Sequence, residues 1–161
     1  MNIQNKCKKI KIVLTDVDGV LTDGGMYYTK DGDIMKRFYT RDGMGVTLLR
    51  KNNIPTVIVT KESTHMVKQW AKNMKVSKLY DGIEKKEKII EKICSEFKVK
   101  NEEIAYIGDD VNDIELLTKV GFSAAPADSI QKVKTICDYV CKTKSGQGVF
   151  REICDLILSE K

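Results

Sequence analysis

The amino-acid sequence predicts a doubly wound α/β fold, in which helices cover both faces of a parallel sheet. Short apolar runs alternate with longer amphipathic stretches along the chain, the pattern expected of buried strands joined by helices. Acidic clusters directly follow two of these runs, as at a ligand site outside the carboxyl ends of parallel strands. With 161 residues, 42% of them hydrophobic, the chain suits one domain better than two. We therefore expect a single domain over residues 1–161.

The expected strands and helices alternate in chain order. The strands are Ile10 to Leu14, Thr56 to Val59, Lys78 to Tyr80, Ile104 to Ile107 and Phe122 to Ala124, and the helices are Ser63 to Lys72, Lys86 to Phe97 and Asn112 to Lys119. Ser63 and Asn112 are suitable N-caps, because their side-chain oxygens can accept hydrogen bonds from the first free N–H groups of a helix. Gly121 follows the last helix closely enough to help end it. This order predicts the doubly wound sheet.

A β-hairpin is expected as an insertion at about residues 25–39. Two β-prone runs flank Lys30-Asp31-Gly32-Asp33, and an Asp-Gly pair in that setting indicates a hairpin turn. Met26, Tyr28, Phe38 and Tyr39 lie on its faces, and a two-stranded hairpin cannot bury such side chains by itself. The hairpin therefore packs against another subunit or folds back onto its own sheet.

Composition limits the classes of function. The formal charge of +5 comes from 28 basic and 23 acidic residues spread along the chain without an arginine-rich arm, which makes nucleic-acid binding the weaker interpretation. A mildly positive field would instead steer a phosphorylated, carboxylate-bearing substrate. The five cysteines have neither a disulfide framework nor zinc-type spacing. Because a signal-peptide core and an apolar run of ~18 residues are also missing from the sequence, we expect a cytoplasmic protein that does not contact membranes.

Chemically reactive side chains follow four of the expected strands. They are Asp16 and Asp18 after the first strand, Thr60 after the second, Lys86 after the third, and Asp109, Asp110 and Asp113 after the fourth. The carboxyl ends of parallel strands share one edge of the sheet, so these groups are expected to converge. Mg²⁺ prefers a few carboxylates together with water and phosphate oxygens. Asp110 and Asp113 either bind the ion through water or orient its ligands.

This constellation predicts phosphoryl transfer. Asp16 can attack phosphorus to give an aspartyl-phosphate that water then hydrolyses. Asp18 can protonate the leaving alkoxide and later deprotonate the water. Thr60 can donate a hydrogen bond to the phosphoryl oxygens, and Lys86 can neutralise their charge. Asp109 would complete the metal shell.

The same residues resemble the haloacid dehalogenase superfamily. Residues 16–24, Thr60, Lys86 and residues 108–113 look like its four motifs, in order and suitably spaced. Segments 41–45, 120–128 and 146–152 resemble the capless branch that hydrolyses 3-deoxy-D-manno-octulosonate 8-phosphate. The resemblance covers almost the whole chain and implies a Rossmann-like core with a projecting hairpin and no cap domain.

The resemblance also implies partners and ligands. It implies a homotetramer in which four hairpins pair into a central barrel and each neighbour partly covers an active site. Mg²⁺ would be held by Asp16, the backbone carbonyl of Asp18, and Asp109. The substrate would be a phosphorylated sugar acid of lipopolysaccharide or sialic-acid type biosynthesis. Candidate substrate-binding residues are Arg41, Gly43, Lys61, Glu62 and Arg151.

One segment departs from the family pattern. Where the octulosonate enzymes usually read Thr-Gly-Arg, this chain has Thr60-Lys61-Glu62. A glutamate there is similar to relatives that act on nine-carbon sugar acids, such as 2-keto-3-deoxynononate or N-acylneuraminate 9-phosphate. Arg41-Asp42-Gly43 looks more like the octulosonate type. We expect the octulosonate as substrate and keep the nine-carbon acids as the alternative.

Other readings of these residues stay open. Lys61 either restores a cation beside Glu62 or points into solvent, and Arg41 and Arg151 either contact substrate or lie on an ordinary surface. A receiver-like signalling module also uses aspartate, threonine, lysine and an acidic pair, but there the acidic pair comes early. A module that only tetramerises a partner enzyme could lose its acids, and this chain retains them.

Overall fold

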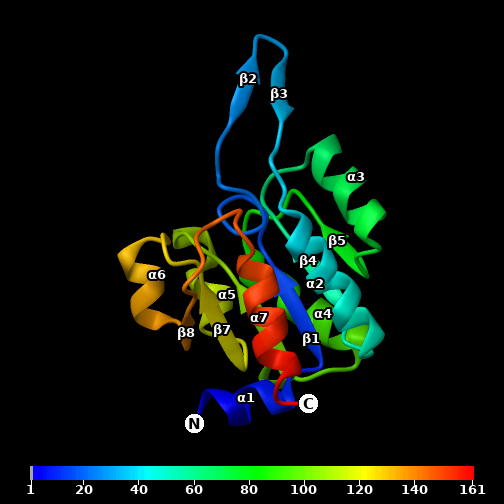
Figure 1. Ribbon diagram of the computed structural model, residues 1–161, viewed down its shortest axis with the longest axis vertical. Coiled ribbons are helices and arrows are strands. Elements are labelled where there is room, and N and C mark those ends of the chain that lie inside the picture. The colour runs from blue at the N-terminus through cyan, green and yellow to red at the C-terminus, as the bar shows by residue number, and fades with distance from the viewer. Residues whose placement is uncertain (1) are drawn as a thin grey trace.

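The computed structural model describes residues 2–161 and contains a six-stranded parallel sheet (Figure 1). Its spatial order is β5-β4-β1-β6-β7-β8. The strands are β1 (Ile12–Thr15), β4 (Thr56–Val59), β5 (Lys78–Tyr80), β6 (Ile104–Ile107), β7 (Phe122–Ala125) and β8 (Tyr139–Val140). The chain runs outward from β1 through β4 to β5, and then returns to β6 on the other side of β1. The predicted doubly wound fold is confirmed, and its topological switch point lies at β1.

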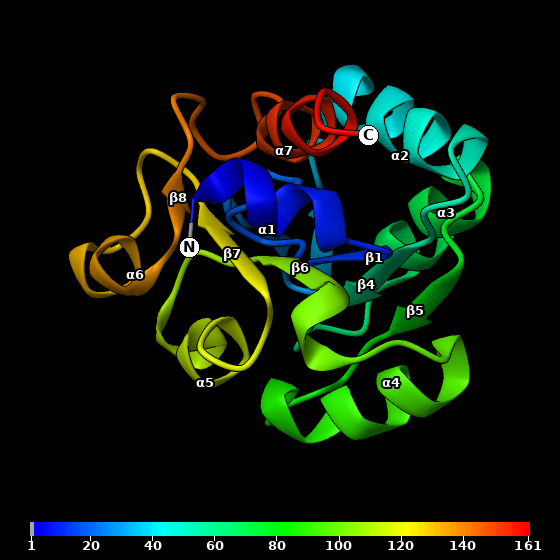
Figure 2. The same ribbon diagram turned by 90° about the horizontal axis from the view of Figure 1, so that it is seen from below.

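Helices cover both faces of this sheet (Figure 2). One face carries α1 (Ile3–Lys9), α2 (Thr40–Lys51), α3 (His65–Met74) and α7 (Val149–Leu158), and the other carries α4 (Ile90–Phe97), α5 (Ile114–Leu117) and α6 (Gln131–Ile136). Short 3₁₀ turns are η1 (Lys86–Ile89), η2 (Asn101–Glu103) and η3 (Val111–Asp113). Among residues 2–161, the structure has no helix with the length and apolar character needed to span a bilayer.

The central strand shows why the sheet is buried on both sides. Val13 packs into the core beneath α2 and α7, whereas Ile12 and Leu14 pack into the core on the α4 side. All four residues of β1 are buried. Because successive side chains of a strand point to opposite faces, a continuous apolar run is the sequence that a doubly covered strand requires.

The sequence located the five expected strands to within two residues but missed several elements. β1 begins at Ile12 rather than Ile10, because Ile10 ends the preceding helix α1. Strand β8 and helices α1, α2, α6 and α7 were not expected. Helix α2 has only a weak apolar stripe, with four glycine or threonine residues among its twelve, so periodicity could not reveal it.

Both proposed N-caps are wrong. Helix α3 begins at His65, and Thr64 is its cap, accepting a hydrogen bond from the N–H of Val67 at 3.4 Å. Ser63 instead donates its hydroxyl to Asp81. Asn112 lies inside η3, whose cap is Asp110. In each case a better-placed oxygen lies within two residues of the expected cap.

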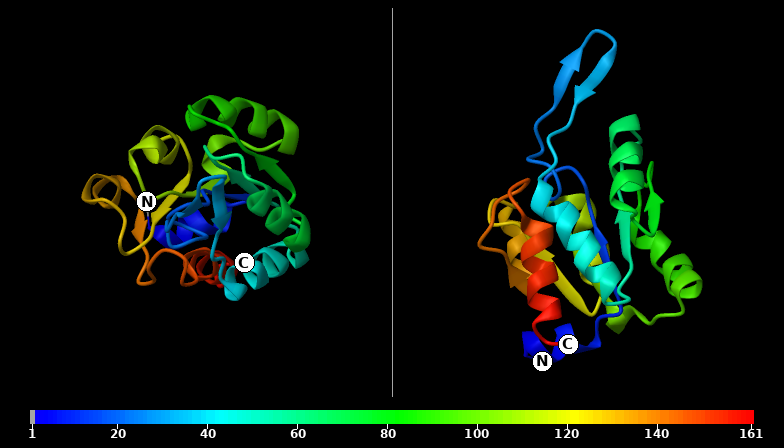
Figure 3. Two further views of the ribbon diagram at one scale, coloured as in Figure 1. Left: turned by 90° about the horizontal axis from the view of Figure 1, so that it is seen from above. Right: turned by 45° about the vertical axis from the view of Figure 1, so that its right-hand side comes forward.

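The hairpin is a separate two-stranded sheet that projects beyond the carboxyl edge of the main sheet (Figures 1 and 3). It consists of β2 (Tyr27–Thr29) and β3 (Gly32–Met35). The turn lies within the expected stretch: Lys30 and Asp31 make it, and Gly32 begins β3, paired with Thr29. Gly32 has φ +107°, a conformation that side chains on other residues disfavour.

The hairpin leaves its apolar side chains uncovered. Met26, Tyr28, Ile34 and Met35 are 59%, 61%, 60% and 48% exposed. The alternative that the hairpin folds back onto its own sheet is therefore wrong. The base of the hairpin contacts the main domain, where the Phe38 ring stacks on the Trp70 ring of α3 with centroids 4.9 Å apart.

Helices α2 and α7 are joined by a buried carboxylate. Asp42 of α2 accepts a hydrogen bond from the backbone N–H of Arg151 at 2.9 Å. Gly148, the N-cap of α7, supplies no side-chain hydrogen bond, so Asp42 caps that helix from outside. Asp42 is fully buried. Burial raises its pKa to about 7, although hydrogen bonds from Arg151 and Phe150 oppose the rise.

Replacing Asp42 should change how stability depends on pH. The pKa of this group rises from 3.8 to about 7 on folding, so between these values the folded state binds more protons and the free energy of unfolding falls as pH rises. Three pKa units correspond to about 4 kcal/mol. In Asp42→Asn the amide oxygen can still accept the hydrogen bond from Arg151. Because the amide does not titrate, the decrease in the free energy of unfolding that Asp42 causes as pH rises should be absent.

Urea unfolding at about pH 5 and about pH 8 measures the difference. Asp31→Asn, in the exposed hairpin turn, is the control and should keep the wild-type pH dependence. An Asp42→Asn variant with that same pH dependence would contradict the assignment.

Candidate active site

The candidate site lies at the carboxyl edge of the three central strands. Asp16 follows β1, Thr60 follows β4 and Asp109 follows β6, and β1 is hydrogen-bonded to both neighbours. Their side chains therefore meet at the switch point, as predicted. A cavity of about 360 Å³ opens there, lined by Asp16, Asp18, Thr60, Lys61, Glu62, Asp109, Asp110, Val111 and Asn112.

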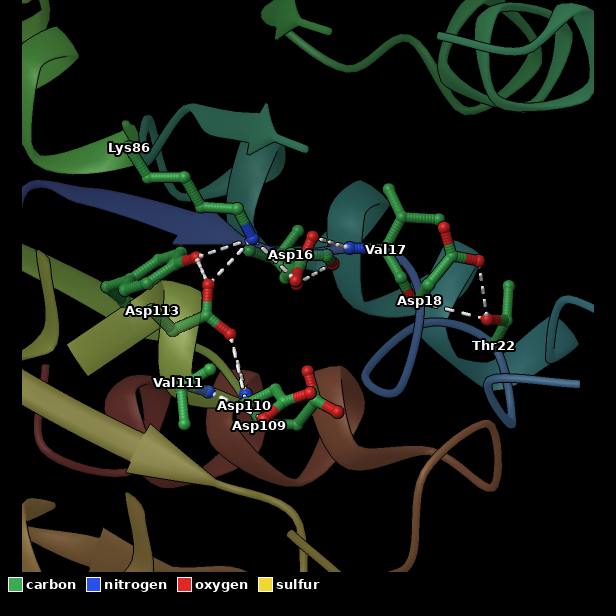
Figure 4. A network of polar contacts seen from close by, with 11 residues as sticks. Asp16, Val17, Asp18, Thr22, Lys86, Asp109, Asp110, Val111 and Asp113 are labelled. Carbon is green, nitrogen blue, oxygen red and sulfur yellow. Dashed lines mark hydrogen bonds and ion pairs between the residues drawn. The ribbon is translucent and has the colours of Figure 1, made fainter. Parts of the chain in front are cut away.

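A buried lysine joins two carboxylates behind this cavity (Figure 4). The Nζ atom of Lys86 lies 2.6 Å from Oδ2 of Asp16 and 2.6 Å from Oδ1 of Asp113. Burial alone would lower the pKa of Lys86, but these carboxylates raise it above its ordinary value. The lysine is thus held as a cation. Neighbouring Lys85 is exposed, so of these two lysines it is Lys86 that lies against the carboxylates.

Asp113 orients the loop after β6. Its Oδ1 accepts hydrogen bonds from Lys86 and from the Tyr106 hydroxyl, at 2.6 and 2.5 Å. Its Oδ2 accepts from the backbone N–H groups of Asp109 and Asp110, at 2.9 and 3.3 Å. A Cβ on Gly108 would lie 2.6 Å from Cβ of Asp113, so glycine is needed for this approach. With both oxygens engaged, Asp113 is better suited to orienting ligands than to binding an ion.

Asp16 and Asp109 have the character of metal ligands. Their carboxylate oxygens and those of Asp113 approach within 4.8 Å of one another. The Asp109 carboxylate receives no hydrogen bond from residues 2–161. Burial and the neighbouring carboxylates raise the pKa of Asp109 to about 8, and burial followed by repulsion from Asp113 raises that of Asp16 to about 7. A divalent cation with oxygen ligands would relieve this excess negative charge, so these residues fit one.

The loop after β1 lies against Asp109. Gly19 has φ +85°, and a Cβ there would lie 2.0 Å from Oδ2 of Asp109. Only glycine permits this approach. The Asp18–Gly19 backbone therefore borders the carboxylate cluster, where a carbonyl oxygen can add to the donor set.

The Asp18 side chain is held by a residue that sequence reasoning missed. Its Oδ1 accepts from the Nζ of Lys36 at 2.6 Å and from the Thr22 hydroxyl at 3.3 Å. The Lys36 side chain comes from the base of the hairpin and is 2% exposed. Oδ2 of Asp18 is buried without a hydrogen-bond partner among the described residues. In the sequence Lys36 and Arg37 are adjacent basic residues between Ile34-Met35 and Phe38-Tyr39, and nothing in that pattern indicates that the lysine is buried.

The candidate substrate-binding residues fall into two groups. Lys61 and Glu62 line the cavity. Arg41 and Arg151 instead line a second, open cavity of about 580 Å³, together with Lys142 and other residues. The structure thus does not bring either arginine to the carboxylate cluster of the same chain.

Gly43 has a packing role. It is buried in α2, where a Cβ would lie 2.4 Å from the sulfur of Met74 on α3. A side chain there would force the Met74 side chain to move. Gly43 does not line the cavity at the carboxylate cluster of its own chain.

Comparisons with known proteins agree with this geometry. A model of haloacid dehalogenase-like hydrolases matches residues 79–153. The chain is 35% identical to the 3-deoxy-D-manno-octulosonate 8-phosphate phosphatase of Haemophilus influenzae over 156 residues, which is 97% of this chain and 87% of that protein. The cobalt-bound form of the Haemophilus influenzae enzyme superposes with a TM-score of 0.94 at 35% identity, covering 96% of this chain and 91% of the other.

A further solved structure shows a relative with ligands. The enzyme from Moraxella catarrhalis, in complex with a magnesium ion, a phosphate ion and a KDO molecule, superposes with a TM-score of 0.95 at 32% identity. The match covers 99% of this chain and 91% of that one. The chain therefore belongs to the 3-deoxy-D-manno-octulosonate 8-phosphate phosphatase family of haloacid dehalogenase-like hydrolases, and it is a phosphatase.

Proposed function

We propose that this phosphatase is Mg²⁺-dependent and hydrolyses 3-deoxy-D-manno-octulosonate 8-phosphate through an aspartyl-phosphate. The observation that carries the proposal is the pairing of Asp16 with buried Lys86, 2.6 Å apart, behind a cavity that Asp16 and Asp109 both line. The names of the relatives and the ligands of the Moraxella catarrhalis enzyme support the choice of substrate and metal.

In the first step a carboxylate oxygen of Asp16 attacks phosphorus. A new P–O bond to Asp16 forms while the bond to the sugar oxygen breaks, and the leaving alkoxide takes a proton from Asp18. The ion pair with Lys86 opposes the rise in the pKa of Asp16 and so favours its ionised form. Thr60, which lines the cavity, can donate its hydroxyl hydrogen to a phosphoryl oxygen.

In the second step water attacks the phosphorus of the aspartyl-phosphate. Asp18, now ionised, accepts a proton from that water, and the P–O bond to Asp16 breaks to release phosphate. Asp18 can serve in both steps because its Oδ2 has no hydrogen-bond partner among the described residues. The carboxylate of Asp16 is regenerated.

The proposed metal site consists of Asp16, the backbone carbonyl of Asp18, and Asp109. When bound there, Mg²⁺ would neutralise the phosphoryl oxygens and the nearby carboxylates. Asp113 orients the Asp109 loop through its hydrogen bonds. Asp110 is the N-cap of η3, and its side chain accepts a hydrogen bond from the N–H of Val111. Both residues are therefore proposed to position ligands rather than to bind the ion directly.

Asp16→Asn should abolish the reaction while leaving the fold intact. An amide is a poor nucleophile, so kcat is expected to fall by at least about 10³-fold. Phosphate release from octulosonate 8-phosphate measures the effect, with Mg²⁺ and with EDTA. Asp31→Asn is the matched control and should keep the wild-type rate. An Asp16→Asn variant of unchanged rate would remove Asp16 as the nucleophile, and release unaffected by EDTA would remove the metal.

Glu62 favours a second candidate substrate. It lines the cavity beside Lys61 and is exposed there. A carboxylate in place of a guanidinium reverses the local charge facing a carboxylate-bearing sugar, so the bound pose should differ. The alternative substrates are therefore the 9-phosphates of 2-keto-3-deoxynononate and N-acylneuraminate.

Comparing kcat/KM for the three sugar phosphates tests the choice of substrate. The wild-type kcat/KM should be highest for the octulosonate phosphate. Glu62→Arg should raise the ratio of kcat/KM for the octulosonate to that for the nononate by about tenfold, because one charged contact changes. Glu102→Arg, at an exposed site on η2, should leave the ratio unchanged. A wild-type preference for a nine-carbon acid would replace the octulosonate as the substrate.

We also propose that the hairpins of four chains pair in a homotetramer. The exposed Tyr28, Ile34 and Met35 support this assembly, because apolar side chains on a two-stranded sheet need a covering partner. Contact of Arg41 or Arg151 with substrate would require a neighbouring subunit.

Ile34→Lys should weaken this assembly. A charge at an interface core is strongly disfavoured, so sedimentation velocity should show smaller species at micromolar concentration. Ile136→Lys, which places the same charge on a partly exposed residue of α6, is the control and should keep the wild-type sedimentation coefficient. A wild-type monomer, or an Ile34→Lys tetramer, would contradict the proposal.

A further inference from the structure

We propose that Ser145 and Asp128 form a positioning pair that fixes the loop after β1 and, through it, the metal site. Ser145 lies between β8 and α7, and Asp128 lies between β7 and α6. Neither residue belongs to the four motifs, and neither lines the cavity. The inference rests on the proposed function, because it takes Asp18 and Asp109 as metal ligands.

The pair contacts the loop through one hydroxyl group. Oγ of Ser145 donates to the backbone carbonyl of Gly19 at 2.6 Å and lies 2.8 Å from Oδ1 of Asp128. The same carboxylate oxygen accepts from the backbone N–H of Ser145 at 2.9 Å. A serine hydroxyl has one proton, which these two acceptors share. Asp128 thus accepts hydrogen bonds from both the backbone N–H and the hydroxyl of Ser145, which fixes the backbone and the rotamer of that residue.

Asp128 stays ionised in this arrangement. Burial alone would raise its pKa, but the hydrogen bonds from Ser145 lower it below its ordinary value. Ser145 is 8% exposed, so water competes little for these bonds.

The next residue makes a second contact with the same loop. The N–H of Gly146 donates to the carbonyl of Val20 at 3.1 Å. Gly146 has φ +65°, and a Cβ there would lie 2.5 Å from the backbone nitrogen of Asp23. The segment thus lies directly against the loop, with no room for a side chain between them.

Gly19 contacts both Ser145 and the carboxylate of Asp109. Its carbonyl is held by Ser145, while a Cβ on the same residue would lie 2.0 Å from Oδ2 of Asp109. The Asp18 carbonyl belongs to the preceding peptide. Movement of Gly19 would therefore change the spacing between Asp109 and the Asp18 carbonyl. Groups that orient metal ligands in this way typically contribute 10- to 100-fold, as an order of magnitude, to metal affinity.

Ser145→Ala tests the pair by removing only the hydroxyl. Calorimetry without substrate should show a Kd for Mg²⁺ about tenfold weaker than wild type. The kcat at subsaturating Mg²⁺ should fall, while KM for the sugar phosphate stays the same, because no substrate contact is lost. Ser145→Thr retains a hydroxyl and should restore Mg²⁺ affinity.

Ser129→Ala is the matched control. Ser129 is 6% exposed, and its Oγ has no hydrogen-bond partner among residues 2–161, so this variant should bind Mg²⁺ like wild type. An Mg²⁺ affinity of Ser145→Ala equal to that of Ser129→Ala would overturn the pair. A loss in Ser145→Ala that Ser145→Thr does not restore would also overturn it. A wild-type protein that binds no Mg²⁺ would instead refute the proposed metal site, and the inference with it.

Discussion

The buried contact between Lys86 and the two carboxylates of Asp16 and Asp113 is the interaction on which the rest of the site depends. All three groups are at most 7% exposed at their side chains. Removing one partner of a buried ion pair typically costs about 3–5 kcal/mol, because it leaves an uncompensated charge. The lysine therefore links the loops after β1 and β6, and its charge favours the ionised form of Asp16 that attack on phosphorus requires.

Close approach of backbone segments shapes the site around this cluster. Gly19 lies against Asp109, Gly108 against Asp113, and Gly146 against Asp23. Each position would clash if it carried a Cβ atom. Three loops from distant parts of the chain can thus converge on one small volume, where acidic side chains outnumber cations and a divalent ion fits.

The hairpin connects the site to the surface proposed for assembly. Lys36 at its base is paired with Asp18, whereas Ile34 and Met35, two residues and one residue earlier, are exposed. The difference in exposure between Lys36 and these two residues does not come from the alternation of side chains along a strand. Strand β3 ends at Met35, and the Lys36 side chain, just beyond it, reaches Asp18. Residues 34–36 therefore include both the lysine that pairs with the proposed acid–base residue Asp18 and two exposed apolar side chains.

Five of the six strands, their parallel topology and the four groups of reactive side chains could be predicted from the sequence alone. These features follow from local patterns, namely apolar runs and the polar residues that come directly after them. Parallel strands place their carboxyl ends at one edge of the sheet, so the residues that follow them lie close together. The hairpin was also visible, because turn residues between β-prone runs are a local signal.

The contacts between distant segments could be found only in the folded chain. Tyr106 reads as an ordinary strand residue and Ser145 as a loop residue, yet they bond Asp113 and the Gly19 carbonyl. Arg41 and Gly43 carried a family pattern, but helix α2 places them away from the carboxylates. A hydrogen bond across 126 residues of chain depends on where two loops meet in space, and no periodicity or local propensity records that.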